Sequence, residues 1–290
     1  MWEEYLFANS VEHALELLAR HKGRAQIIAG GTDLVLQSQR GQCPATVVVD
    51  ITRIPGLNAI DEREEHIRIG AQVTHAQIAA SPLIRTKAPI LAMACSQVGG
   101  PQTRNAGTLV GNVVNAQPAA DGATALFALD AELEVATLQG RRWEPISQIY
   151  RGVGVCTINA CEEMVTAVRF KPLHGACGCS YQRLARRKAL TLPTLVVAAV
   201  LEMQGDRIGM ARLAIGPVAP TPYRAADAEA YLIGKTPDDA TFAEAGQLAA
   251  AKARPRDSLI RGSGEYRTAM VAVLVRRALA EAAQQCNGRQ

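Results

Sequence analysis

Residues Thr103 to Asp121, TRNAGTLVGNVVNAQPAAD, are the most informative stretch of this chain. Small residues, amides and one acid are packed closely in it, and Gly107 and Gly111 let the backbone turn tightly and approach a ligand without a Cβ atom in the way. The polar side chains of Thr108, Asn112, Asn115 and Asp121 can hydrogen-bond a nucleotide. The alternative is an Asn- and Gly-rich loop that satisfies its own backbone through Asx turns.

A second glycine turn lies upstream, in IIAGGTDL, residues Ile27 to Leu34. The apolar run Ala25–Ile28 predicts a short strand, and Gly30-Gly31 ends it. Thr32 or Asp33 is then expected to cap a helix over Leu34–Gln39. Such a helix start offers unpaired N–H groups to a phosphate. The alternative is a turn used for packing only, since the stretch lacks the Lys-Ser/Thr ending of a Walker loop and the third glycine of a Rossmann fingerprint.

Outward from these turns, the hydrophobic pattern predicts alternating helices and strands. A Ser10-capped helix should cover EHALELLARH, and a longer amphipathic helix should run from Leu83 to Val98, where Gly99-Gly100-Pro101 stops it. A helix starting at Thr74 should end before Pro82. The expected strands are Thr46–Ile51, His66–Ala71, VTAVRF, SYQRLA, TLVVAAVLEM and RIGMARLAIG, and the expected C-terminal helices are AADAEAYLI, Phe242–Lys252 and Tyr266–Ala282.

Composition places the chain among globular proteins with two packed domains. It has 290 residues, 48% of them hydrophobic, and a net charge of only +4 with scattered Lys and Arg, which makes nucleic acid a poor partner. The N-terminal MWEEYLFANS has acids where a secretory signal has cations, and no apolar run approaches the ~20 residues of a membrane span. We therefore expect a cytoplasmic protein.

Seven cysteines in such a chain are expected to be reduced thiols rather than disulfides. Cys156, Cys161, Cys177 and Cys179 lie close enough in sequence to suggest a metal or iron–sulfur site. Their spacing does not form the paired C-x-x-C motifs that zinc sites favour, so we expect small buried or loop thiols and no bound metal.

The two glycine turns together resemble the FAD-binding medium subunit of the molybdenum hydroxylases, the family of xanthine dehydrogenase and carbon monoxide dehydrogenase. The resemblance extends through YQRLARRKAL, LAIGPVAPTPYRAADAE and RGSGEYRTAMVAVLVRRALAEA, and so covers nearly the full length. It implies an α+β fold: an FAD-binding domain of the vanillyl-alcohol-oxidase (PCMH) type over 1–175, with subdomains of about 1–55 and 56–175. A small domain over 176–290, with an antiparallel sheet and three helices, should follow it.

The resemblance also implies positions for the FAD-binding residues. The pyrophosphate loop of the family corresponds to Ile27, Ile28, Ala29, Gly30, Gly31, Thr32, Asp33 and Leu34, and its second flavin loop to Thr108, Leu109, Val110, Gly111 and Asn112. Asp121 stands where the family has the acid that holds the adenosine ribose. Val98 and Val165 match positions where an apolar side chain lies near the cofactor rings, although both could equally be ordinary core residues.

Two positions depart from the family pattern. Val110 stands where the family commonly has a glycine, and a β-branched residue tolerates neither a positive φ nor a close ligand approach. Arg183 stands where a lysine is usual at or next to this position. We expect Arg183 to face the flavin or its phosphates; the alternative is a solvent-exposed strand residue.

The implied function is electron relay in a larger oxidoreductase. A molybdopterin-binding large subunit would oxidise the substrate, and a [2Fe-2S] small subunit would pass electrons to FAD and on to NAD or another acceptor, in an assembly expected to be a dimer of heterotrimers. No catalytic residue is expected on this chain, because no nucleophile–base pair stands out. The alternatives are a stand-alone flavin oxidoreductase and an interaction subunit that has lost the flavin.

Overall fold

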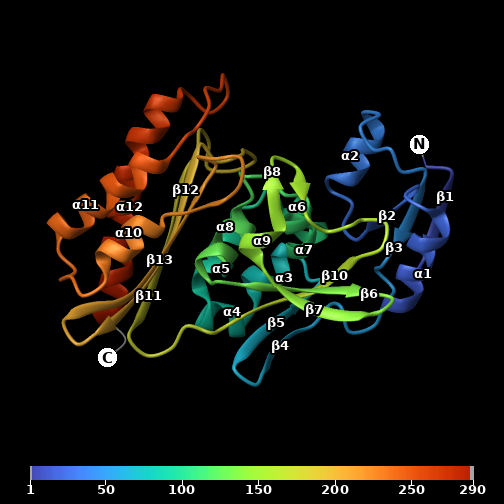
Figure 1. Cartoon of the computed structure of the whole chain (residues 1–290), viewed down its shortest axis with the longest axis horizontal. Coiled ribbons are helices and arrows are strands. Elements are labelled where there is room, and N and C mark those ends of the chain that lie inside the picture. The colour runs from blue at the N-terminus through green and yellow to red at the C-terminus, as the bar shows by residue number, and fades with distance from the viewer. Residues whose placement is uncertain (1, 288–290) are drawn as a thin grey trace.

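The computed structural model describes residues 2–287 and contains four sheets, flanked by helices (Figure 1). The first sheet is parallel, in the order β1-β3-β2, and is formed by β1 (Glu4–Phe7), β2 (Ala25–Ile28) and β3 (Val47–Asp50). The helix α1 (Val11–His21) begins where expected, because the Ser10 side chain accepts a hydrogen bond from the backbone N–H of His13 at 3.0 Å. The short helix α2 (Leu34–Gln39) follows β2.

The second sheet is antiparallel and lies in the middle of the molecule. Its order is β4-β5-β10-β6-β7, from β4 (Ile60–Arg63), β5 (His66–Gly70), β6 (Glu132–Thr137), β7 (Gly140–Pro145) and β10 (Met164–Phe170). The short helix α9 (Ile146–Ile149) and the hairpin of β8 (Tyr150–Gly152) and β9 (Val155–Cys156) connect β7 to β10.

Six short helices connect β5 to β6 and bring the two glycine turns of the sequence together. They are α3 (His75–Ala80), α4 (Pro82–Lys87), α5 (Pro89–Ser96), α6 (Pro101–Ala106), α7 (Leu109–Val114) and α8 (Asp121–Ala128). The single helix expected over Leu83–Val98 is wrong: Ala88 leaves the helical region at φ −149°, because the proline ring that follows disfavours helical backbone at the preceding residue. Most of Thr103–Asp121 is likewise helical rather than an open loop.

The C-terminal part, described over residues 177–287, contains an antiparallel sheet with three helices on one face, as expected of the fold class (Figure 1). The strands are β11 (Cys177–Leu184), β12 (Leu195–Gln204), β13 (Arg207–Gly216) and β14 (Tyr223–Arg224), and the helices are α10 (Ala226–Leu232), α11 (Asp239–Lys252) and α12 (Gly264–Asn287).

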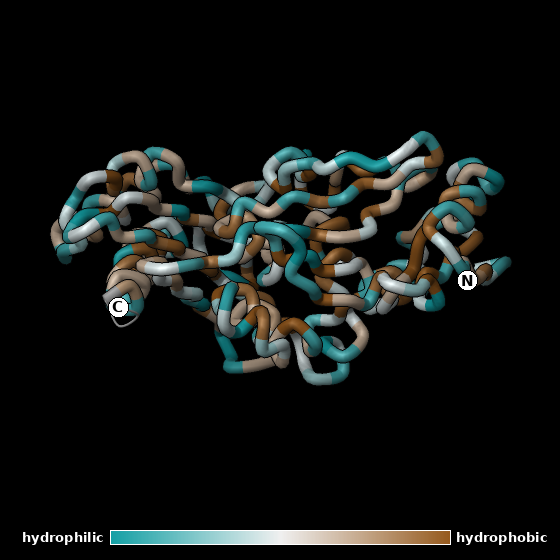
Figure 2. Tube along the Cα trace, turned by 90° about the horizontal axis from the view of Figure 1, so that it is seen from below, coloured by the Kyte–Doolittle hydropathy of each residue, from teal (hydrophilic) through white to brown (hydrophobic). Residues whose placement is uncertain are grey.

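Strand β12 is buried on both faces, which explains its nearly continuous apolar sequence. Leu195, Val197 and Leu201 pack with the three C-terminal helices, whereas Ala198 and Val200 join the large core of the preceding sheet. Figure 2 shows hydrophobic segments in the interior of the molecule and hydrophilic ones along many of the outer turns. The chain is therefore α+β. One face of its C-terminal sheet packs into the same hydrophobic core as the central sheet.

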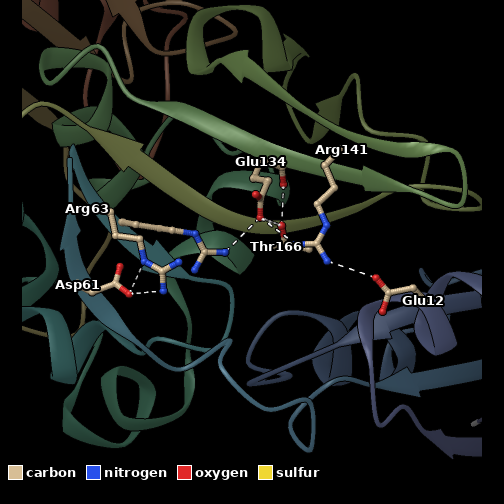
Figure 3. Close-up of polar contacts among 7 residues, drawn as sticks. Glu12, Asp61, Arg63, Glu134, Arg141 and Thr166 are labelled. Atoms are coloured by element: carbon tan, nitrogen blue, oxygen red, sulfur yellow. Dashed lines mark hydrogen bonds and ion pairs between the residues drawn. The ribbon is translucent and has the colours of Figure 1, made fainter. Parts of the chain in front are cut away.

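A polar cluster joins α1 to the central sheet (Figure 3). The Glu134 carboxylate on β6 accepts hydrogen bonds from Thr166 and from Arg68, the latter at 3.1 Å, and lies 3.6 Å from Arg141. Arg141 also reaches Glu12 on α1 at 3.3 Å. The half-buried Arg68–Glu134 pair lies within the central sheet and is screened less than an exposed pair, whereas the contact of this cluster with α1 is the exposed Arg141–Glu12 pair.

Candidate flavin site

The two glycine turns lie against each other although more than seventy residues separate them. A β-carbon built on Gly30 would lie 1.8 Å from the carbonyl oxygen of Ala106, so only glycine permits this approach. A β-carbon on Gly107 would lie 3.3 Å from the hydroxyl of Thr32. The first turn and the segment that leads into α7 therefore form one continuous surface.

The first turn presents unpaired backbone donors. Gly31 has φ +67°, a conformation that L side chains rarely adopt. Among the described residues, no acceptor takes a hydrogen bond from the N–H groups of residues 30–33. Asp33 is the N-cap residue of α2, but the expected side-chain cap is absent, because neither the Thr32 nor the Asp33 side chain accepts a backbone hydrogen bond there. These free amides are donors of the kind that a diphosphate requires.

The second turn is held by Thr108 and Asn112. Thr108 caps α7, accepting a hydrogen bond from the backbone N–H of Gly111 at 3.0 Å. The Asn112 side-chain oxygen accepts one from the N–H of Ala123 at 3.2 Å, which ties α7 to α8. Val110 lies within the first turn of α7, so its backbone is helical and the concern about positive φ at this position does not apply.

Asp121 and Arg183 meet in a buried ion pair between α8 and β11. Arg183 Nε donates to Asp121 Oδ1 at 3.0 Å, and the Tyr181 hydroxyl donates to the same oxygen at 2.7 Å. Burial raises the pKa of the Asp121 carboxyl, although Arg183 and Tyr181 act in the opposite direction. The Arg183 side chain is only 9% exposed, so the alternative of a solvent-exposed strand residue is wrong. The second oxygen, Oδ2, accepts no hydrogen bond from the residues that the structure describes.

His75 is a buried residue of this region that sequence reasoning missed. Its ring lies between two glycines: β-carbons built on Gly107 and on Gly122 would each lie 3.5 Å from it. Its Nδ1 is 3.4 Å from the Cys95 sulfur, and its backbone N–H donates to the Gly107 carbonyl at 3.0 Å. Burial, and secondarily Arg104, lowers the pKa of His75 to about 4, so the imidazole is neutral. Tyr181 was also missed, although it lies two residues before Arg183 on one strand and therefore on the same face.

No contact among the described residues places Val98 or Val165 at these turns. The Val98 carbonyl accepts a hydrogen bond from Arg104 at 3.0 Å, and its side chain is half-buried. Val165 is a buried core residue of β10, opposite Val135 and next to a register shift in the sheet. Both therefore stay predictions as cofactor contacts.

The cysteine group does not assemble into a site. Cys177 and Cys179 are buried on β11, whereas Cys161 lies near Gly23, between α1 and β2. Among residues 2–287, no three potential metal-ligating side chains come together.

Comparison with known proteins decides the family. A family model for the FAD binding domain in molybdopterin dehydrogenase matches residues 2–172, and one for the CO dehydrogenase flavoprotein C-terminal domain matches residues 180–282. This chain is an FAD-binding medium subunit of the molybdenum hydroxylase family. The cofactor of this flavoprotein subunit is FAD, and the expected PCMH-type fold and oxidoreductase class are confirmed.

Similar proteins cover the whole flavoprotein subunit. The 6-hydroxypseudooxynicotine dehydrogenase complex subunit alpha of Paenarthrobacter nicotinovorans is 33% identical, over 96% of this chain and 94% of that one. The carbon monoxide dehydrogenase medium chain of Hydrogenophaga pseudoflava is 30% identical over 98% of each chain. A solved structure of carbon monoxide dehydrogenase from that organism superposes with a TM-score of 0.95, at 30% identity over 99% of both chains.

Of the helices within residues 2–287, none combines the length and apolar character needed to cross a membrane.

Proposed function

We propose that this subunit relays electrons, taking them from the iron–sulfur clusters of a partner subunit through FAD to NAD or another acceptor. The partners would be a molybdopterin-binding large subunit and a [2Fe-2S] small subunit, in a cytoplasmic dimer of heterotrimers. Relatives named as a subunit of a dehydrogenase complex, a medium subunit of a hydroxylase and a medium chain of a dehydrogenase support this assignment. FAD suits the task because it accepts electrons singly and releases them as a pair.

The observation that carries the proposal is the joined surface of the two glycine turns. In our proposal the free amides of residues 30–33 hold the pyrophosphate, with Ile27–Leu34 around them, and Thr108–Asn112 holds the cofactor from the other side. Asp121 would accept a ribose hydroxyl through Oδ2, with Oδ1 kept in place by Tyr181 and Arg183. Val98 and Val165 would lie toward the rings.

The residues around this surface are suited to placement rather than to acid–base chemistry. The titratable groups beside the turns include the buried His75, Cys95 and Asp121 and the half-buried Tyr181 and Arg183. His75 is neutral, and burial raises the pKa values of the Cys95 thiol and of the Tyr181 hydroxyl, so these three groups do not exchange a proton readily near pH 7.

The test is to express this chain with and without the genes that neighbour its own. With its partners, reduction of the iron–sulfur clusters under anaerobic conditions should be followed by loss of the oxidised-flavin absorbance. Alone, the chain should bind FAD, show slow NADH-to-dye activity and oxidise no N-heterocycle. Turnover of an organic substrate by the isolated chain, at the ~1–10³ per second typical of enzymes, would contradict the relay and support a stand-alone oxidoreductase.

A further inference from the structure

Two loops of the C-terminal part lie together beside the candidate flavin site. The β11–β12 loop, residues 185–194, follows Arg183, and the loop of residues 254–263 leads into α12 (Figure 1). Arg186 Nη1 lies 3.5 Å from the carbonyl oxygen of Ile260, and the buried Arg267 donates to the carbonyl of Thr194 at 3.2 Å. We call these two segments the paired loops.

The paired loops expose apolar side chains more than any other described part of the chain. Leu259 is fully exposed, and Ile260, Leu190 and Leu192 are 70%, 65% and 62% exposed; no other large hydrophobic residue among those described exceeds 53%. Single exposed apolar residues are ordinary, but four on two touching loops form a patch of the kind that marks interaction sites.

The same loops gather positive charge without counter-ions. Residues 185–190 contribute three positive charges and residues 254–261 a net two, which together exceed the +4 of the whole chain, so the remainder is net negative. The cations are Arg186, Arg187, Lys188, Arg254, Arg256 and Arg261, and no carboxylate among the described residues forms an ion pair with any of them.

These cations also repel one another. Burial lowers the pKa of Arg261, and the positive charge of Arg256 lowers it further. The guanidinium of Arg267 is buried and is satisfied by the backbone carbonyls of Thr194, Arg256 and Pro217 rather than by an acid. An acidic surface placed on the paired loops would relieve this repulsion and bury the four apolar side chains at the same time.

The position of the paired loops indicates which partner would dock there. The Thr191 carbonyl accepts a hydrogen bond from Arg183 at 2.6 Å, so the loop is tied to the Asp121 ion pair. A β-carbon built on Gly100 would lie 2.8 Å from Leu190 Cδ2, which places Leu190 over the segment that leads into the second glycine turn. A protein seated on the paired loops would therefore lie next to the cofactor loops.

We propose that the paired loops dock an acidic, apolar-centred surface of the subunit that delivers electrons to this one. The proposal rests on the relay function proposed above. Positive charges around the patch would steer the partner and set the orientation, and the leucine and isoleucine side chains would supply the buried centre of the interface.

The test uses the FAD-loaded chain together with its own co-expressed partner subunits. Two double variants probe the surface: Arg256→Glu with Arg261→Glu, and Leu259→Ser with Ile260→Ser. Matched controls are Arg85→Glu on α4 and Leu138→Ser in the β6–β7 turn, an exposed cation and an exposed leucine away from the paired loops. The measurements are the dissociation constant for the partner subunits at two salt concentrations, the bound FAD per chain and the melting temperature.

Both double variants should weaken partner binding about tenfold or more, while the controls match the parent and FAD content and melting temperature stay unchanged. The affinity of the parent for the partner subunits should fall as the salt concentration rises. The affinity of the charge-reversed variant should change by a much smaller factor. Variants that bind the partners as tightly as the parent overturn the surface while leaving the relay intact. A parent that co-purifies with no partner subunit overturns the relay, and the docking surface with it.

Discussion

At the scale of single residues, His75 makes the stability of the protein depend on pH. Burial lowers its pKa in the folded state from 6.5 to about 4, so protonation favours the unfolded chain. The stabilising contribution is complete above pH 6.5 and is lost as the pH falls from 6.5 toward 4. From these two values we expect the free energy of unfolding to drop by about 2 kcal/mol between pH 7.5 and pH 5 on account of His75.

Urea denaturation of the parent and of His75→Gln at both pH values checks this. The variant should be less stable at pH 7.5, because the ring fills the space between Gly107 and Gly122, but its stability should fall less on acidification. Parallel losses in parent and variant would show that another group titrates.

Asp121 is expected to serve both the fold and the cofactor. Asp121→Ala leaves the Arg183 guanidinium buried without its counter-charge and should cost about 3 kcal/mol of stability. It should also weaken FAD binding by about 1–3 kcal/mol through the lost ribose hydrogen bond. Tyr181→Phe removes one hydrogen bond to the same carboxylate, so it should lower stability by about 1 kcal/mol and leave FAD affinity near that of the parent. A denaturation series measures the changes in stability, and titration of the folded proteins with FAD measures the changes in affinity. Equal FAD affinities for Asp121→Ala and the parent would refute the ribose assignment.

At the scale of elements, the first glycine turn can be tested against a turn with the same backbone. Gly31 and Gly41 both have φ +67°, but a β-carbon on Gly31 would meet Ile28 and Val35 within 3.2 Å, whereas one on Gly41 would meet nothing within 4 Å. Gly31→Val and Gly41→Val therefore share a backbone cost of about 1–2 kcal/mol. Only Gly31→Val should lose flavin absorbance per mole of protein. A Gly31→Val protein as yellow as the parent would overturn the pyrophosphate assignment.

Local sequence patterns predicted most elements but few of the contacts between them. The strand Ala25–Ile28 was predicted with its observed bounds because its apolar run is followed closely by the two glycines Gly30 and Gly31. The helix over Leu83–Val98 failed because Pro89 outweighed the apolar periodicity. The close approach of Gly30 to Ala106 and the position of the His75 ring depend on packing between distant segments, and no local pattern encodes that.

At the scale of the whole molecule, the C-terminal sheet should unfold together with the rest. Ala198 and Val200 of β12 belong to the main core, and the opposite face of the strand packs on α10–α12. Both tryptophans, Trp2 and Trp143, lie outside the C-terminal part, so fluorescence reports on the first two sheets while circular dichroism reports on the whole chain. The two thermal transitions should coincide. A separate lower transition in the dichroism alone would show that the C-terminal sheet melts independently.

The shared carboxylate of Asp121 has a consequence for dynamics. One oxygen of this carboxylate accepts hydrogen bonds from Tyr181 and Arg183 of β11. A ligand bound to the other oxygen would therefore stabilise β11 by mass action without touching the strand. Amide hydrogen exchange in β11 should therefore slow when FAD is added, by an amount that tracks its concentration. Hydrogen exchange in β11, which lies far along the chain from the pyrophosphate turn, would thus report the fraction of the protein that has FAD bound.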